Sequence, residues 1–366
     1  MNVGAGAQSA MPDREALRRV AADAVTFLHE SWDESRHAYP SALRLIGSSV
    51  QAEFEEGEVL GSTMLALLGL LSAARARLDV TERLVTRRLE EFSSRWSSEL
   101  THPRDWALWT ILMSESGDED GVQKGVRGLS ALHPAATIPL DVHALAAWAL
   151  ARAAGSGVRS AESRLEAFGS TLADRIDPHT GLPRPGGGGR VAFFDEIAFS
   201  VRALHELAIV TGEPAADRRV RQATAAICST QGRLGEWPWL IDVRSGRPVH
   251  VYPLFTPHQD ALAMLFLHPL LDRGDPGAHG AIASSLGWAS GRNELGRSMY
   301  VPPPLFAYRG IEKRWFLRRQ RRLVRSRLNA VLGLRPKTIG AARLQLNPDC
   351  LPDHPGWFLT VWSSRL

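Results

Sequence analysis

The chain has 366 residues, of which 44% are hydrophobic and 22% are charged, which is typical of globular proteins and excludes a disordered or fibrous chain. The first residues carry neither the basic region nor the apolar core of a signal peptide, and no apolar run reaches the roughly 18 residues that a membrane span needs. Cys228 and Cys350 lie far apart without metal-binding spacing, so we expect no disulfide framework, no metal, no cofactor and a cytoplasmic location.

The net charge of +4 is unevenly distributed along the chain. Eight basic residues and no acid lie between 313 and 327, so the rest of the chain is mildly acidic. Apolar side chains such as Phe316 and Leu323 fall on one side of this segment. Within an expected insertion at 297–345, residues 313–331 are therefore predicted to form an amphipathic helix that attaches peripherally to the anionic inner face of a membrane. A solvated helix is the alternative, and nucleic-acid binding is not expected because no known motif accompanies the charge.

Charged, amphipathic helices alternate along the chain with predominantly apolar ones. The charged segments are 13–32, 79–96, 121–132, 160–176 and 214–230. The segment 276–290, which contains no Asp, Glu, Lys or Arg, is taken as the sixth outer helix. The apolar segments are 59–74, 107–113, 144–154, 197–210, 259–271 and 354–362. Six such pairs indicate a closed array with the charged helices outside and the apolar helices inside. The pattern predicts one all-α domain over residues 1–366, an (α/α)6 barrel.

Titratable residues stand at or near the start of most apolar segments. If each outer helix runs into the next inner helix, all inner helices begin at the same end of the barrel. The long loops 177–194, 231–257 and 291–353 belong to that end, and long loops in a compact domain are usually functional. The predicted ring of side chains consists of Asp105, Asp141, His143, Asp195, Glu196, His258, Asp260 and His354.

Three of these positions pair two titratable groups within one helical turn, which suits acid–base catalysis. A lone acid at a helix start is ordinarily an N-cap, but capping does not require a histidine beside it. We predict as catalytic the pairs Asp141 and His143, Asp195 and Glu196, and His258 and Asp260.

Asp195 is the preferred proton donor, because Phe193 and Phe194 would desolvate it and raise its pKa. The helix N-terminus favours the anion instead, and the sequence leaves this balance open. Asp141 is the second choice, and His143 or His258 would orient the acid or take the final proton.

Aromatic and polar side chains near the same end are predicted to bind substrate. Aromatic faces suit sugar rings, and they suit carbocations through cation–π attraction. Arg190 follows the Gly186–Gly189 run, which favours a flexible lid. The predicted substrate-binding residues are Trp106, Arg190, Trp237, Trp239, Tyr252 and His354.

The spacing Ile227-x3-Gln231-x3-Gly235-x-Trp237 resembles the QW repeat of the squalene–hopene cyclase and prenyltransferase α/α-toroid superfamily. The resemblance implies a toroid fold, with Gln231 and Trp237 tying an outer helix end to the next inner helix. It also implies a terpene-cyclase-like enzyme that cyclises or isomerises an isoprenoid by proton-initiated chemistry. The acid motif of class II cyclases is incomplete here, where Asp141 and His143 stand at the corresponding helix start.

Two other functions fit the same residues. (α/α)6 barrels also host carbohydrate-active enzymes, and the loop with Trp237 and Trp239 followed by His258 suits a glycoside hydrolase, a polysaccharide lyase or a sugar epimerase acting on a glycan. A non-catalytic scaffold at the membrane surface is a third interpretation. A deep apolar pocket would favour an isoprenoid, whereas a wide polar cleft would favour a glycan.

Overall fold

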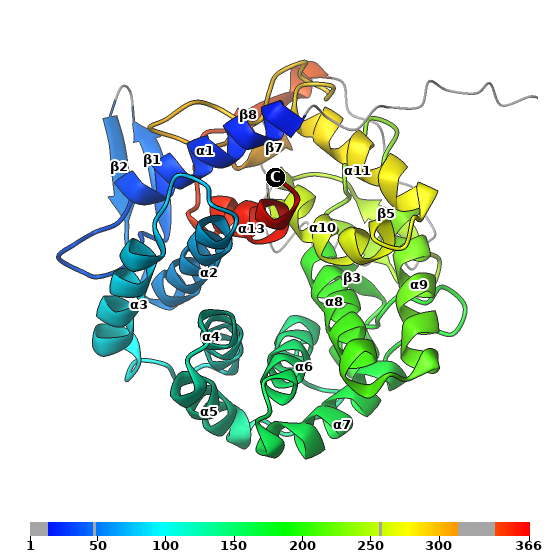
Figure 1. Ribbon diagram of the computed structural model, residues 1–366. Helices are drawn as coiled ribbons and strands as arrows, with labels where there is room; N and C mark the ends of the chain where they lie inside the picture. The colour runs from blue at the N-terminus through cyan, green and yellow to red at the C-terminus, as the bar shows by residue number, and fades with distance from the viewer. Residues whose placement is uncertain (1–13, 47–48, 256–257, 314–340) are drawn as a thin grey trace, which may run out of the picture.

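The computed structural model describes residues 14–46, 49–255, 258–313 and 341–366, and twelve α-helices of these ranges form two concentric rings (Figure 1). The inner helices are α2 (Glu56–Arg75), α4 (Pro103–Ser116), α6 (Leu140–Gly155), α8 (Phe194–Thr211), α10 (His258–Leu271) and α13 (Asp353–Trp362). The outer helices are α1 (Arg14–Glu30), α3 (Glu82–Trp96), α5 (Glu119–Gly128), α7 (Arg159–Asp174), α9 (Pro214–Cys228) and α11 (Pro276–Ala289).

The inner ring is closed. Each inner helix packs against the inner helices on both sides, and α13 joins the ends of the series by packing between α10 and α2. The predicted (α/α)6 barrel is therefore confirmed.

The residue pattern explains which helices lie inside. The outer helix α3 begins at the N-cap Thr81 and buries a stripe that includes Val85, Leu89 and Phe92, while its charged residues other than the buried Arg88 lie toward the outside. The inner helix α2 is buried along most of its length. By length and composition alone α2 qualifies as a membrane span, contrary to the expectation from the sequence, but 72% of its most apolar window is buried within the structure.

The two ends of the barrel differ in their connections. Inner helices lead to outer helices through short links such as 117–118, 156–158 and 212–213, whereas outer helices lead to inner helices through 129–139, 175–193, 229–257 and 290–352. Every described strand lies in a connection that leads from an outer helix to the next inner helix. All inner helices therefore start at one end, which carries the long loops, as predicted.

Three small antiparallel sheets stiffen these connections, as a β1–β2 hairpin and as sheets of order β3-β4-β5 and β6-β7-β8. The strands are β1 (Ala42–Ile46), β2 (Ser49–Glu53), β3 (Val191–Phe193), β4 (Leu240–Asp242), β5 (Arg247–His250), β6 (Leu254–Phe255), β7 (Gly310–Lys313) and β8 (Leu344–Asn347). The β4–β5 hairpin turns at 242–246, and Asp242 pairs with Arg247 across the turn. The strands were not predicted, since each is too short to show a two-residue period.

The basic segment lies mostly outside the described residues, which resume at Ala341 after Lys313. The amphipathic helix at 313–331, its attachment to a membrane, and the single domain over 1–366 with an insertion at 297–345 all remain predictions.

Candidate active site

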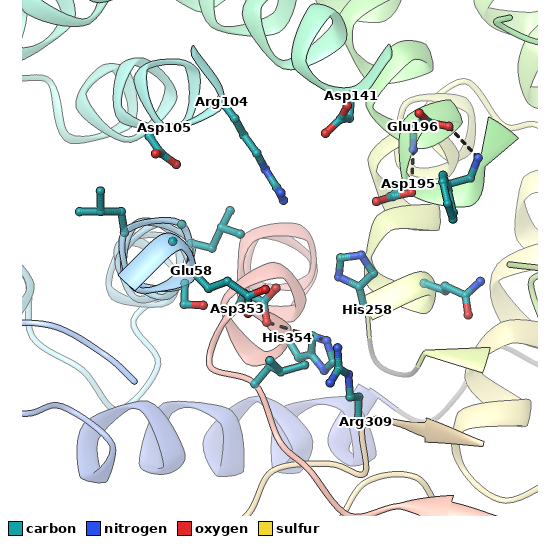
Figure 2. Close-up of a pocket in the computed structure, with 18 of the residues that line it drawn as sticks. Glu58, Arg104, Asp105, Asp141, Asp195, Glu196, His258, Arg309, Asp353 and His354 are labelled. Atoms are coloured by element: carbon teal, nitrogen blue, oxygen red, sulfur yellow. Dashed lines mark hydrogen bonds and ion pairs between the residues drawn. The ribbon is translucent and has the colours of Figure 1, made fainter. Parts of the chain in front are cut away.

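A pocket of about 960 Å³ opens at the end of the barrel where the inner helices begin (Figure 2). All six inner helices contribute side chains from their first turns. One contribution from each, in chain order, is Glu58, Asp105, Asp141, Asp195, His258 and Asp353. The partial positive charges of six helix N-termini thus surround one space and favour negative charge there.

Acids dominate the lining of this pocket. Nine carboxylic residues and two arginines line it, besides three histidines. The acids are Glu56, Glu58, Glu99, Asp105, Asp141, Asp195, Glu196, Glu312 and Asp353. A wide, polar space of this kind suits a hydroxyl-rich ligand, because carboxylates accept hydrogen bonds from hydroxyl groups.

Asp195 and Glu196 occupy the first turn of α8. The Phe193 N–H donates to Glu196 Oε2 at 2.7 Å, and the Glu196 N–H donates to Asp195 Oδ1 at 3.0 Å (Figure 2). Burial nevertheless raises the pKa of both carboxyl groups, that of Glu196 to about 8. Asp141 raises both pKa values further by its negative charge. Desolvation therefore outweighs the helix terminus here, and Glu196 keeps its proton at neutral pH.

His258, Asp353 and His354, here called the His–Asp cluster, converge from the starts of α10 and α13. The two imidazole rings are 5.4 Å apart between centroids, and His354 Nε2 is 3.8 Å from Asp353 Oδ1. Burial lowers the pKa of both imidazoles to about 3, with a further contribution from the positive charge of Arg309. Both rings are therefore neutral at pH 7 and are able to accept a proton.

Arg104 and Arg309 are the arginines of the lining. Arg104 extends from α4 toward the middle of the pocket, and Arg309 lies beside His354 (Figure 2). Guanidinium groups in such positions stabilise negative charge that develops on a bound substrate.

His143 and Asp260 do not line the pocket, contrary to the prediction. His143 is fully buried in α6, where its Nε2 lies 2.9 Å from the carbonyl oxygen of Phe168. Asp260 is buried between α10 and α11 and accepts a hydrogen bond from Ser285 Oγ at 2.5 Å. Residues two positions apart on a helix point in different directions, so the partners of Asp141 and His258 turn away from the pocket.

We expect Asp260 to act on stability through pH. Burial raises its pKa from 3.8 to about 7, so its contribution to folding is fully present below pH 4 and is lost as the pH rises through about 7. In Asp260→Asn this loss is absent, so between pH 5 and 8 the variant should lose about 2–4 kcal/mol less unfolding free energy than wild type. Urea unfolding at several pH values measures the difference. Parallel pH profiles for the two proteins would contradict it.

Two of the six predicted substrate-binding residues, Trp239 and His354, line the pocket. Trp239 packs edge-on against Phe193, with ring centroids 5.2 Å apart. An aromatic side chain at a pocket wall is suited to stack on the apolar face of a sugar ring.

The other four predicted substrate-binding residues do not line this pocket and make contacts within the fold. Trp106 packs directly over Gly128 of α5, where even a methyl group would collide with the indole. The Trp237 indole donates to Ser285 Oγ at 3.0 Å, and the Tyr252 hydroxyl donates to Glu294 at 2.8 Å. Arg190 forms a fork of two 2.8 Å hydrogen bonds with Asp242, which stabilises the hairpin turn.

Among the polar pocket residues that were missed or set aside in the sequence are Asp353, Glu58, Arg104 and Arg309. Asp353 directly precedes His354 at an inner helix start, so the signal that identified His354 applied to it as well. Glu58 and Arg104 stand in the first turns of α2 and α4. Arg309 comes from the connection 290–352, where no helical periodicity indicates its place.

No family model and no curated protein matches the chain. Solved structures do match it over nearly its full length. A cellobiose 2-epimerase from Bacillus thermoamylovorans aligns with a TM-score of 0.65 at 10% identity, over 97% of this chain and 100% of the other. A sugar epimerase from a ruminal bacterium aligns with a TM-score of 0.67 at 10% identity, over 96% of this chain and 98% of the other. An unsaturated glucuronyl hydrolase from Streptococcus agalactiae aligns with a TM-score of 0.64 at 12% identity, over 97% of this chain and 93% of the other. The shared property is the fold.

These matches overturn the resemblance to squalene–hopene cyclases and prenyltransferases, because the solved structures reported above are (α/α)6 enzymes of carbohydrate chemistry. The QW-like spacing has a local explanation. Gln231 Nε2 donates to the carbonyl oxygens of Gly235 and Ala281, and Trp237 bonds to Ser285, so the loop is fixed to α11. The spacing therefore reports how this barrel packs and carries no information on an isoprenoid.

Proposed function

We propose that the protein is a carbohydrate-active enzyme, a sugar epimerase that inverts the carbon next to the carbonyl group of a reducing saccharide. The observation that carries this proposal is the pair of neutral imidazoles, His258 and His354, on neighbouring inner helices in an acidic, polar pocket. The fold supports it, since two of the similar structures are described as epimerases and cover nearly the whole chain.

The chemistry needs a proton to leave one face of the carbon and another to reach the opposite face. In the open-chain sugar the C2–H bond is acidic because it lies beside the aldehyde. One neutral imidazole takes the C2 proton, and the electron pair moves onto the carbonyl oxygen as an enediolate. The second imidazole, which has taken the proton of the anomeric hydroxyl as the sugar ring opens, returns a proton to C2 from the other side. The carbonyl is restored and the net change is inversion at C2.

The remaining pocket residues support this sequence. Arg104 and Arg309 stabilise the negative charge of the enediolate oxygen. Glu196, which keeps its proton at neutral pH, is suited to protonate the ring oxygen as the sugar opens. Asp105 and Asp141 accept hydrogen bonds from sugar hydroxyls, and Trp239 covers an apolar ring face.

Glycoside hydrolysis is the second candidate, favoured by the adjacent acids Asp195 and Glu196 at an inner helix start. An α-1,6-mannanase of Salegentibacter, similar at 10% identity with a TM-score of 0.62, is described as inactive when two adjacent aspartates are replaced by asparagine. In this mechanism Glu196 is the general acid, and Asp195 or Asp141 is the second carboxylate.

The two candidates differ in what they do to C2. We expect the purified protein, incubated in D2O with a chelator, to convert cellobiose or a similar reducing disaccharide into its C2 epimer with deuterium at C2. NMR of the products measures both changes. Cleavage of α-1,6-mannooligosaccharides or unsaturated glucuronyl disaccharides without deuterium at C2 would contradict epimerisation and support glycoside hydrolysis. Inertness toward both sets of sugars would reject both candidates.

A further inference from the structure

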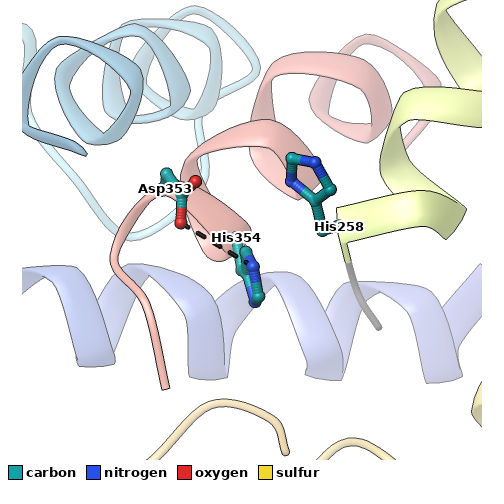
Figure 3. Close-up of side chains that lie close together, drawn as sticks. All are labelled: His258, Asp353 and His354. Atoms are coloured by element: carbon teal, nitrogen blue, oxygen red, sulfur yellow. Dashed lines mark ion pairs between the residues drawn. The ribbon is translucent and has the colours of Figure 1, made fainter. Parts of the chain in front are cut away.

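The His–Asp cluster has the donor set of a metal site. Two imidazoles and one carboxylate, from α10 and α13, each place one donor atom within 4.8 Å of the others (Figure 3). Tetrahedral zinc, with bonds of about 2.0–2.2 Å, separates its donor atoms by about 3.3–3.6 Å. Small side-chain rotations are therefore enough to bring the three donors to bonding distance.

Three polar atoms of the cluster lack a hydrogen-bond partner among the described residues. Nδ1 of His258, Nδ1 of His354 and Oδ1 of Asp353 are buried and make no hydrogen bond within the described ranges. His354 is only 3% exposed. Buried polar atoms without a hydrogen-bond partner are uncommon in folded proteins, and a bound ion satisfies such atoms.

The carboxylates around the cluster favour a cation, whereas the helix N-termini oppose it. Nine carboxylic residues, of which Glu196 keeps its proton, line the pocket against two arginines. Arg309 lies beside His354 and opposes binding, but Asp353 belongs to the cluster itself and Glu58 reaches toward it from α2 (Figure 2). The net excess of acids outweighs the two guanidinium groups.

We propose that His258, Asp353 and His354 bind one divalent transition-metal ion, for which zinc is the best match. Imidazole with carboxylate suits zinc and cobalt, whereas magnesium requires an oxygen shell. Three protein ligands leave a fourth position open toward the pocket, where water or a sugar oxygen binds.

Binding has a consequence for catalysis, which rests on the proposed function. An ion bound by both imidazoles occupies the lone pairs that would accept the C2 proton. Zinc therefore blocks epimerisation in competition with proton transfer, and a chelator restores it. The binding itself is independent of what the enzyme catalyses.

The experiment titrates the full-length, chelator-treated and dialysed protein with Zn²⁺ by calorimetry, and with Co²⁺ by visible absorption. We expect one ion per chain and no binding of Mg²⁺. Asp353→Asn and His354→Asn should each weaken Zn²⁺ binding by at least about 100-fold, since loss of a supporting residue alone costs 10–100-fold. His102→Asn is the matched control, because His102 lines the same pocket outside the cluster and asparagine preserves its N-cap acceptor.

The binding data also separate this site from the function. Absence of Zn²⁺ and Co²⁺ binding by the wild type overturns the proposal, as does equal binding by the ligand variants, which would place the ion elsewhere. Should the variants fail to fold, imidazole NMR of the wild type decides, because Zn²⁺ must shift the signals of two histidines. Tight zinc binding, together with no epimerisation of any sugar by the chelator-treated enzyme, would support the site and refute the proposed function.

Discussion

Replacement of His258 or His354 by asparagine is expected to lower epimerisation by roughly 10²–10⁴-fold, the usual contribution of a positioned acid–base group. In the proposed mechanism each imidazole serves one face of C2, so each variant lacks the base for one epimer and the acid for the other. Asparagine keeps the size and polarity of the side chain but accepts no proton at neutral pH. Initial rates in the presence of a chelator measure the loss without interference from bound metal.

Deuterium exchange gives this prediction a sharper form. In D2O, one variant should still exchange the C2 proton of the first epimer and fail with the second, and the other variant should show the reverse. His279→Gln, which removes an exposed histidine from the outer helix α11, is the control and should match wild type. Loss of exchange from both epimers in both variants would contradict a two-base mechanism. Full activity in both would remove the histidines from the chemistry.

Substitution of Gly356 by alanine is expected to destabilise the barrel by about 3 kcal/mol or more, beyond ordinary overpacking, because the collision involves backbone. A Cβ atom at Gly356 would lie 2.4 Å from the carbonyl oxygen of Leu65, and one at Gly69 would lie 2.5 Å from that of Gly356. These glycines allow α2 and α13 to cross with their backbones in contact. Urea unfolding measures the change.

The control for this substitution is a helix glycine with space around it. A Cβ at Gly280 in α11 meets nothing within 4 Å, so Gly280→Ala should stabilise the protein by about 0.5–1 kcal/mol. The opposite signs of the two changes separate crowding from helix propensity. Equal stability of wild type and Gly356→Ala would show that α13 moves away from α2 at little cost.

The fold was predictable because its signal repeats six times. Charged and apolar helices alternate in the sequence, and this alternation decides which helices face solvent and which face the core. Because each outer helix leads to the next inner helix, all inner helices were expected to begin at the same end of the barrel. The short strands and the close crossing at Gly69 and Gly356 depend on tertiary contacts and leave no comparable pattern.

The site was predictable only in part. The starts of the inner helices surround one pocket, and Asp141, Asp195, Glu196, His258 and His354 line it, while their roles in catalysis or binding remain predictions. His143 and Asp260 were expected to face the pocket because they stand two positions from Asp141 and His258. Residues two apart on a helix point in different directions, so these two side chains do not reach the pocket. The substrate class was wrongly inferred from the spacing of Gln231 and Trp237, which reflects how the loop packs against α11.

Closure of the ring by α13 has a consequence for folding kinetics. Contacts between α13 and α2 join segments near opposite ends of the chain, and the Arg14 side chain reaches the Leu366 carbonyl across 352 positions. Contacts of such long range are slow to form, because their loop-closure entropy is lost before they contribute stability. Asp353 and His354 sit on the closing helix. A chain that has formed its other helices but not this contact has nearly native helix content and no assembled His–Asp cluster, so the proposed activity requires this long-range contact.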